Sequence, residues 1–221
     1  MKKPKLVLLD IDHTLFNSQT YKETAFSRIA DFLAKDWKKQ DIEQNCYTMC
    51  NNQIRKLGFF DPEAFADMVA SYYGRQQDKQ HVLSLLLDAS LFEEHAYKEV
   101  VAVVTALSKI AEVGIYSQGL TKFQERKIAS FRHLFTEKHV YISQDKKQEM
   151  ARIFANYKEY AIFFVDDILP ILALASTIDS TIFTIWIRRG EYAERMTHVE
   201  GFSPSAQIGD LQKVIDIVKQ N

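Results

Sequence analysis

The most constraining stretch of the chain is residues 6 to 15, where a short apolar run ends in two closely spaced carboxylates. Leu6 to Leu9 are all apolar, and such a run between polar residues is typical of a buried strand in a parallel sheet. Asp10 and Asp12 follow directly. Side chains at the carboxyl end of such a strand open into the crevice where α/β folds bind ligands, and alternate residues of an extended chain point the same way. Two acids at one site are unfavourable unless a metal or a substrate compensates them, which favours a chemical role.

Length and composition are those of an ordinary globular protein. The chain has 221 residues, enough for one substantial core and a smaller accessory domain. A net charge of -1 indicates neither a nucleic-acid-binding nor a membrane-binding surface. No apolar run approaches the roughly 18 residues of a membrane span, and the first run is shorter than the roughly 7–15 residues of an export signal. We therefore expect a cytoplasmic monomer or homodimer without nucleic-acid or membrane partners.

Residues 17–94 are predicted to be an all-helical insert. Apolar residues at helical spacing predict helices over residues 21–37, 40–57, 61–73 and about 78–87. Gly58 closes the second helix as a C-cap glycine would, and Pro62 opens the third at its first helical position. Cys46 and Cys50 lie four residues apart in the second helix. They could ligate a metal, but no His or further Cys stands nearby, so a half-buried helix face is the preferred interpretation.

From about residue 95 the chain alternates between strands and helices. Strands are expected at 113–116, 139–142, 161–165 and 181–187. Helices are expected at 97–111, 121–131, about 147–157, about 169–176 and 210–219. This alternation predicts an α/β fold with a doubly wound parallel sheet and right-handed crossovers.

A hydroxyl and a glycine follow the strand predicted at 113–116. Ser117 comes directly after Gly-Ile-Tyr and is followed by Gln118 and Gly119. A hydroxyl at this point can donate a hydrogen bond to a phosphate oxygen, and the glycine lets backbone N–H groups approach the same anion. A serine that caps the helix starting at Thr121 explains Ser117 nearly as well.

Charged pairs stand at two later positions. Lys146 and Lys147 begin the helix after the strand at 139–142, although two adjacent lysines are most often only solvated. Asp166 and Asp167 end the strongest strand of the chain, after Phe-Phe-Val. Neither acid would be compensated without a cation, so a cation site is the better explanation.

Taken in order, these segments resemble the four motifs of the haloacid dehalogenase-like (HAD) hydrolases, which are mostly magnesium-dependent phosphatases. The matching positions are Asp10, Asp12 and Thr14 in the first motif, Ser117 in the second, Lys146 or Lys147 in the third, and Asp166 and Asp167 in the fourth. The resemblance implies a HAD-like Rossmannoid core, residues 1–16 plus 95–221, and a helical cap, residues 17–94. The fourth motif departs from the common pattern, since Val165 replaces a glycine and Ile171 and Leu172 stand where an acid or Asn often follows.

The resemblance also implies a reaction, the hydrolysis of a small phosphomonoester such as a phosphorylated sugar or nucleotide. Asp10 would attack phosphorus and form an aspartyl-phosphate. Asp12 would protonate the leaving oxygen and then take a proton from water. Dehalogenases of the family lack this second acid, so Asp12 favours phosphate ester hydrolysis.

The same resemblance implies how metal and phosphate are held. Mg²⁺ would be bound by Asp10, by the backbone carbonyl of Asp12, and by Asp166 or Asp167. The phosphate oxygens would be held by Ser117, Gln118 and the active-site lysine, which is Lys146 or Lys147, with Lys146 favoured. Spacing alone does not choose between the two lysines or between the two acids.

Several alternatives stay open at this stage. The phosphoryl group could pass to an acceptor other than water, as in a phosphotransferase or mutase, or the chain could be an inactive binding protein on the same fold. His13, where the family often has Gly or Asn, is assigned a structural role because an extended backbone would point it away from Asp10 and Asp12. Thr14 is expected to bond locally and to shape the turn.

Overall fold

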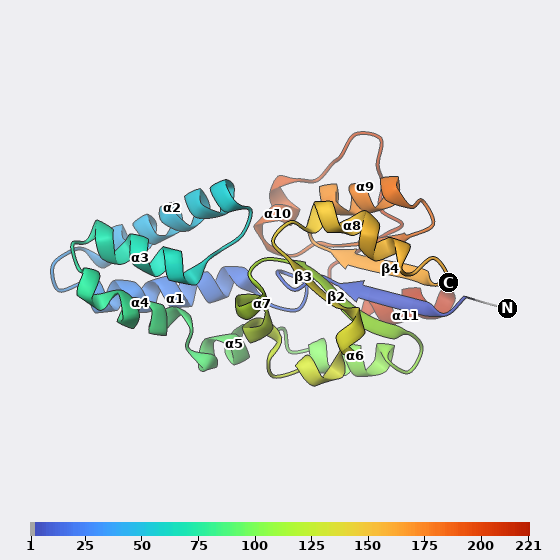
Figure 1. Cartoon of the computed structure of the whole chain (residues 1–221), viewed down its shortest axis with the longest axis horizontal. Helices are drawn as coiled ribbons and strands as arrows, with labels where there is room; N and C mark the ends of the chain where they lie inside the picture. The colour runs from blue at the N-terminus through green and yellow to red at the C-terminus, as the bar shows by residue number, and fades with distance from the viewer. Residues whose placement is uncertain (1–2) are drawn as a thin grey trace.

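The computed structural model of the chain describes residues 3–221, except for the side chains of residues 191 and 192. The first two residues of the predicted core segment 1–16 therefore lie outside the described range. Figure 1 shows two lobes, one built only of helices and one in which helices flank a sheet.

The sheet is six-stranded and parallel throughout the described residues, which confirms the predicted fold class. Its strands are β1 (Lys5–Leu9), β2 (Glu112–Gln118), β3 (Val140–Ser143), β4 (Ala161–Asp166), β5 (Phe183–Ile187) and β6 (Ala206–Ile208). The spatial order is β3-β2-β1-β4-β5-β6, so the N-terminal strand lies in the middle with β2 and β4 on either side. The carboxyl ends of these three neighbours therefore meet at one edge of the sheet.

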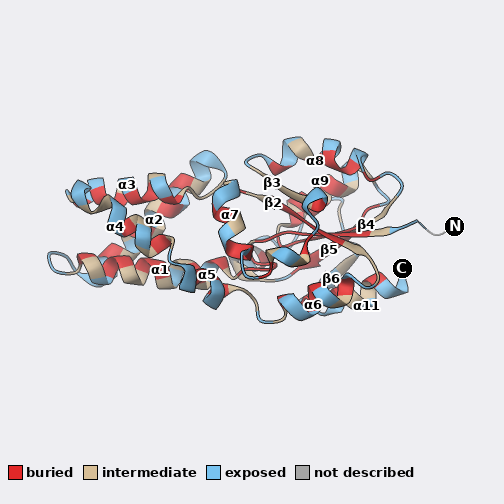
Figure 2. Cartoon of the chain, turned by 60° about the horizontal axis from the view of Figure 1, so that its bottom comes forward, coloured by how far each residue is buried: buried red, intermediate tan, exposed pale blue. Residues whose placement is uncertain are grey.

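Helices cover both faces of the sheet. The helices of the lobe that contains the sheet are α6 (Val100–Leu107), α7 (Thr121–Ile128), α8 (Lys146–Ala155), α9 (Leu169–Ile178), α10 (Gly190–Arg195) and α11 (Lys213–Gln220). Short 3₁₀ turns lie at η2 (Arg132–Leu134) and η3 (Glu137–His139). In β1, Leu6 and Leu8 pack in one cluster with α8 and α9, whereas Val7 and Leu9 pack in another with α6 and α11. This alternation is the period of two that a strand buried on both faces requires. Figure 2 shows the buried residues concentrated on the strands and on the helix faces that meet them.

The segment between β1 and β2 begins with a helical lobe. Its helices are α1 (Ser18–Leu33), α2 (Lys39–Leu57), α3 (Pro62–Tyr72), η1 (Gln76–Asp78), α4 (Lys79–Leu86) and α5 (Ala89–His95). The capping residues act as the sequence predicts. Gly58 adopts a left-handed φ of 83° and donates its N–H to Ile54, and the Asp61 carboxylate accepts the N–H groups of Glu63 and Ala64.

The two chain crossings between the lobes lie side by side. Asn17 N–H donates to the His95 carbonyl over 2.8 Å, and Tyr97 N–H donates to the Leu15 carbonyl over 3.0 Å. This pairing joins the start of α1 to the end of α5, close to the boundaries proposed for core and cap. The division into 1–16 plus 95–221 and 17–94 itself stays a prediction.

Besides the 3₁₀ turns, two short α-helices and one short strand were not predicted from the sequence. They are α5, α10 and β6, none longer than seven residues. Elements this short contain too few residues for a hydrophobic period to emerge. The first helix also starts earlier than predicted, at Ser18, because the Asn17 side chain accepts the N–H of Thr20 and caps it there.

The preferred interpretation of the cysteines is confirmed. Cys46 and Cys50 form no disulfide in the part of the chain that the structure describes, and both lie on α2 fully buried in the hydrophobic core. Among the described helices, none has the length and apolar character that crossing a membrane would take.

Close strand packing at Gly114 gives a stability prediction. A Cβ at Gly114 would lie 2.4 Å from the His139 carbonyl oxygen, whereas a Cβ at Gly209 would meet nothing within 4 Å. We expect Gly114→Ala to lower the free energy of unfolding by about 1–3 kcal/mol, because β2 must shift away from His139. Gly209→Ala should stay within about 0.5 kcal/mol of wild type. Urea denaturation of both variants measures this, and equal stabilities would contradict the packing described.

Candidate active site

The predicted motif residues meet at the carboxyl edge of the sheet. Asp10 follows β1, Ser117 lies in β2 and Asp166 ends β4, on three adjacent strands. The Asp10 N–H donates to the Val165 carbonyl over 3.0 Å, which extends the β1–β4 pairing up to this carboxylate. All of them face a cavity of about 170 Å³, which is also lined by helices α1 and α7 and by the loop after α2.

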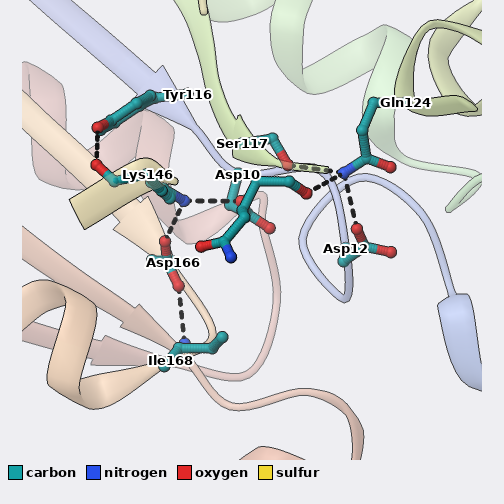
Figure 3. Close-up of polar contacts among 9 residues, drawn as sticks. Asp10, Asp12, Tyr116, Ser117, Gln124, Lys146, Asp166 and Ile168 are labelled. Atoms are coloured by element: carbon teal, nitrogen blue, oxygen red, sulfur yellow. Dashed lines mark hydrogen bonds and ion pairs between the residues drawn. The ribbon is translucent and has the colours of Figure 1, made fainter. Parts of the chain in front are cut away.

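Lys146 occupies the centre of the site. Its Nζ lies 2.7 Å from Asp10 Oδ1 and 2.5 Å from Asp166 Oδ2, and all three side chains are buried (Figure 3). The residue is fixed at the first turn of α8, where its carbonyl accepts the Tyr116 hydroxyl. Lys147, by contrast, is exposed and does not line the cavity. Of the two lysines left open by the sequence, the structure brings Lys146 to Asp10.

Burial and mutual repulsion raise the pKa values of two acids in this cluster, Asp10 and Asp167. Burial raises the pKa of Asp10 to about 7, with further upward contributions from Asp166 and Asp12, although the Lys146 ammonium opposes the shift. Burial and the adjacent Asp166 and Asp10 also raise the pKa of Asp167. Asp167 Oδ2 is buried and has no hydrogen-bond partner among the described residues. The cluster therefore holds more negative charge than Lys146 compensates.

Asp12 belongs to a second group, separate from Lys146. Its carboxylate accepts from Lys127 Nζ over 2.6 Å, from Gln124 Nε2 over 2.8 Å and from the Ser18 hydroxyl. Although burial raises the pKa of Asp12, the Lys127 ammonium and these hydrogen bonds hold it well below its usual range. Asp12 is thus a firmly ionised carboxylate, whereas a general acid needs a proton.

Asp10 and Asp12 have different partners because the backbone between them is not extended, as the sequence analysis assumed it to be. The chain turns after Asp10, and His13 adopts a left-handed φ of 55°. The strict alternation of side chains therefore ends at the strand. As a result, His13 is buried and lines the same cavity as the two acids, instead of facing away from it. The Thr14 hydroxyl, expected to bond locally, has no hydrogen-bond partner in the described residues.

Three residues that contact Asp12 were missed by the sequence analysis. Ser18 begins α1, and Gln124 and Lys127 lie three apart on the buried face of α7. Gln124 Nε2 also approaches Ser117 Oγ at 3.0 Å, so it connects two motif residues (Figure 3). The available signal was a Gln and a Lys at i, i+3 on the apolar face of the helix that follows Ser117.

Gln118 lies on the boundary between the lobes. Its side chain lines the cavity and donates from Nε2 to the Gly58 carbonyl over 3.0 Å. This amide therefore joins the end of β2 to the loop after α2. In this arrangement the Gln118 amide donates to the helical lobe instead of to a ligand. The role predicted for Gln118 in phosphate binding stays a prediction.

The fit of the site to Mg²⁺ can be judged from its donors. Within residues 3–221, no three Asp, Glu, His or Cys side chains form a ready metal site, and an ammonium lies between Asp10 and Asp166. However, the buried Asp167 oxygen has no partner, and the two lysine ammoniums paired with the other three carboxylates leave the four acids with excess negative charge. Hard oxygen donors with excess negative charge suit Mg²⁺. Of Asp12, only the backbone carbonyl could take part, because its carboxylate is bound to Lys127.

The raised pKa of Asp10 gives a prediction about stability and pH. Below about pH 4 the carboxyl is protonated in both the folded and the unfolded chain, and between about 4 and 7 only the folded chain keeps its proton. Stability contributed by this group is therefore lost as the pH rises towards 7. In EDTA, the stability of Asp10→Asn relative to wild type should increase by roughly 2–4 kcal/mol between pH 4 and pH 8. Urea titrations at both pH values measure this, and a difference that does not change with pH would contradict the shift.

Comparison with known proteins identifies the fold. No protein-family model and no curated protein matches the chain by sequence. A haloacid dehalogenase-like hydrolase from Burkholderia xenovorans LB400 has a similar solved structure, with a TM-score of 0.78, 18% identity, and coverage of 99% of this chain and 98% of that one. The HAD-hydrolase YfnB from Bacillus subtilis, bound to magnesium, has a TM-score of 0.68 at 15% identity, with coverage of 98% and 99%. The L-2-haloacid dehalogenase from Xanthobacter autotrophicus, with chloropropionic acid covalently bound, has a TM-score of 0.63 at 15% identity and covers 98% of each chain. The chain therefore has the fold of the haloacid dehalogenase-like hydrolases.

Proposed function

We propose that this chain is a magnesium-dependent phosphatase that hydrolyses a small phosphomonoester through an aspartyl-phosphate on Asp10. The observation that carries the proposal is the position of Asp10, buried at the mouth of the central strand and paired with Lys146 over 2.7 Å. A carboxylate held this way has one oxygen oriented by the ammonium and faces a cavity of metabolite size.

The first chemical step follows from these residues. A carboxylate oxygen of Asp10 forms a bond to phosphorus while the bond from phosphorus to the ester oxygen breaks. Lys146 and the Ser117 hydroxyl are placed to stabilise the phosphoryl oxygens, which gain charge in the transition state. In the second step water attacks the same phosphorus, releases phosphate and restores Asp10.

Asp12 is proposed as the acid and base of these steps. To protonate the leaving oxygen it must leave Lys127 and take up a proton, because its pKa is low while the ion pair holds. Of its two other contacts, Gln124 and Ser18, the latter is the first residue of α1. A movement of the helical lobe would therefore act directly on this carboxylate, and we propose that it releases Asp12 for catalysis.

Mg²⁺ is proposed to bind at Asp10, the Asp12 carbonyl and Asp166 or Asp167. When bound, it would neutralise the charge between the phosphate and the acids. The partnerless Asp167 oxygen and the raised pKa values of Asp10 and Asp167 support this assignment. The magnesium bound to YfnB, a protein of the same fold, is consistent with it.

A second candidate is dehalogenation of a small haloacid, with which the ionised state of Asp12 is compatible, although the presence of Asp12 favours the phosphatase. Halide leaves without a proton, so this reaction needs no acid at Asp12. Asp10 would attack the carbon that bears the halogen, expel halide, and form an ester that water then cleaves. Several proteins of this fold are dehalogenases, including the one with chloropropionic acid covalently bound.

One experiment separates the two candidates. Phosphate release is measured from a panel of phosphomonoesters and halide release from 2-chloropropionate, each with Mg²⁺ and with EDTA. The proposal expects phosphate release that EDTA abolishes and no halide release. Halide release unaffected by EDTA would replace the phosphatase by a dehalogenase, and a phosphorylated second product instead of phosphate would indicate transfer to another acceptor.

The two adjacent lysines provide a matched pair of variants. Lys146→Met removes the ammonium between Asp10 and Asp166 and should lower kcat/KM at least 100-fold, since a charge-assisted contact is lost in the transition state. Lys147→Met changes the same charge at an exposed position and should stay within about threefold of wild type. Circular dichroism checks that both variants fold. Equal activities of the two variants would remove Lys146 from the proposed mechanism.

A further inference from the structure

The cavity contains a third lysine, which the proposed reaction does not use. Lys22 on α1 is half-buried and lines the cavity that contains Asp10 and Asp12. Its ammonium makes no hydrogen bond or ion pair with any group that the structure describes. The other two lysines of the cavity are each paired with a carboxylate, Lys127 with Asp12 and Lys146 with Asp10.

The position of Lys22 follows from the helix. Ser18 and Lys22 are four residues apart on α1 and therefore share one face, about one turn or 5.4 Å apart along the axis. Ser18 contacts the Asp12 carboxylate. The adjacent acid Glu23 accepts a hydrogen bond from Gln19 and does not pair with Lys22. Lys22 thus offers a positive charge one helical turn beyond the reacting groups.

The wall of the cavity near the cap is apolar. Ile54, Phe59 and Phe60 line it from the helical lobe, and Phe123 lines it from α7. The Phe60 and Phe123 rings lie with their centroids 5.5 Å apart, so side chains of both lobes meet at this wall. No carboxylate on this wall could neutralise Lys22, and a half-buried ammonium is most stable when an anion joins it.

We propose that Lys22 binds a carboxylate at the distal end of the substrate, so that the substrates are short phosphorylated carboxylic acids. This inference rests on the phosphatase function proposed above. The phosphoryl group lies at Asp10 and Lys146, a short carbon chain passes the apolar wall, and the carboxylate pairs with Lys22. A cavity of about 170 Å³ suits such a small molecule better than a nucleotide.

Binding is measured by titration calorimetry on the Asp10→Asn variant, which does not turn the ligand over. The ligands are 2-phosphoglycolate and 3-phosphoglycerate, each with a counterpart that keeps the phosphate but lacks the carboxylate, namely ethyl phosphate and glycerol 3-phosphate. We expect the acids to bind about tenfold more tightly than their counterparts, as one additional ion pair would give. Adding Lys22→Met should abolish that preference and leave the binding of the counterparts within twofold.

Two controls make the result specific. Lys22→Arg keeps the charge and should keep at least a threefold preference for the acids. Lys35→Met removes the same charge from an exposed position just beyond α1 and should change nothing. The inference is overturned if Lys22→Met weakens the acids and their counterparts equally, if it weakens neither, or if none of the four ligands binds.

Turnover separates this inference from the function on which it rests. If the wild-type protein releases phosphate from esters but Lys22→Met keeps the same ranking of substrates, the role of Lys22 is wrong and the phosphatase stands. If the wild-type protein releases no phosphate, but the acids bind with the expected dependence on Lys22, the phosphatase is wrong and Lys22 is still a carboxylate site.

Discussion

The site is organised by one buried ammonium. Lys146 joins Asp10 at the end of β1 to Asp166 at the end of β4, and all three groups are withdrawn from water. Removing the ammonium would leave two uncompensated carboxylates in a medium of low dielectric, which is strongly unfavourable. Three features position the Lys146 Nζ atom. They are the strand order of the sheet, the start of α8 at Lys146, and the hydrogen bond from the Tyr116 hydroxyl to the Lys146 carbonyl. Chemistry at the site therefore depends on the packing that supports Lys146.

The second principle of the site is that the pKa values of two nearby acids are shifted in opposite directions. Asp10 has a raised pKa because it is buried and has acidic neighbours, whereas Asp12 has a lowered pKa because Lys127 and two hydrogen-bond donors surround it. Divergent pKa values in one site are the usual means by which a fold distinguishes two residues of the same type. The lowered pKa of Asp12 belongs to the arrangement in which Lys127 and Ser18 of α1 hold its carboxylate, so its use as an acid requires these contacts to change.

The sequence predicted the parallel sheet, the helical insert and the convergence of Asp10, Ser117, Lys146 and Asp166, because apolar runs that end in polar residues mark strand ends directly. Short elements such as β6 were not predicted, because three residues are too few to show an alternation of apolar and polar side chains. The pairing of Asp12 with Lys127 was missed for a different reason. The polar pair on the apolar face of α7 was visible in the sequence, but its contact with Asp12 depends on a backbone turn at His13 and on how α7 packs, which are tertiary properties. The choice of Lys146 over Lys147 likewise required the orientation of α8 against the sheet.

The most direct test of the account is to look for the covalent intermediate on Asp10. The protein is mixed with a phosphomonoester that it hydrolyses, quenched in acid within one turnover and digested, and the peptide that contains Asp10 is analysed by mass spectrometry. We expect a phosphoryl group on Asp10 and none on the same peptide of the Asp10→Asn variant. An unmodified Asp10 peptide during rapid phosphate release, or a phosphoryl group on another residue, would contradict the central role given to Asp10.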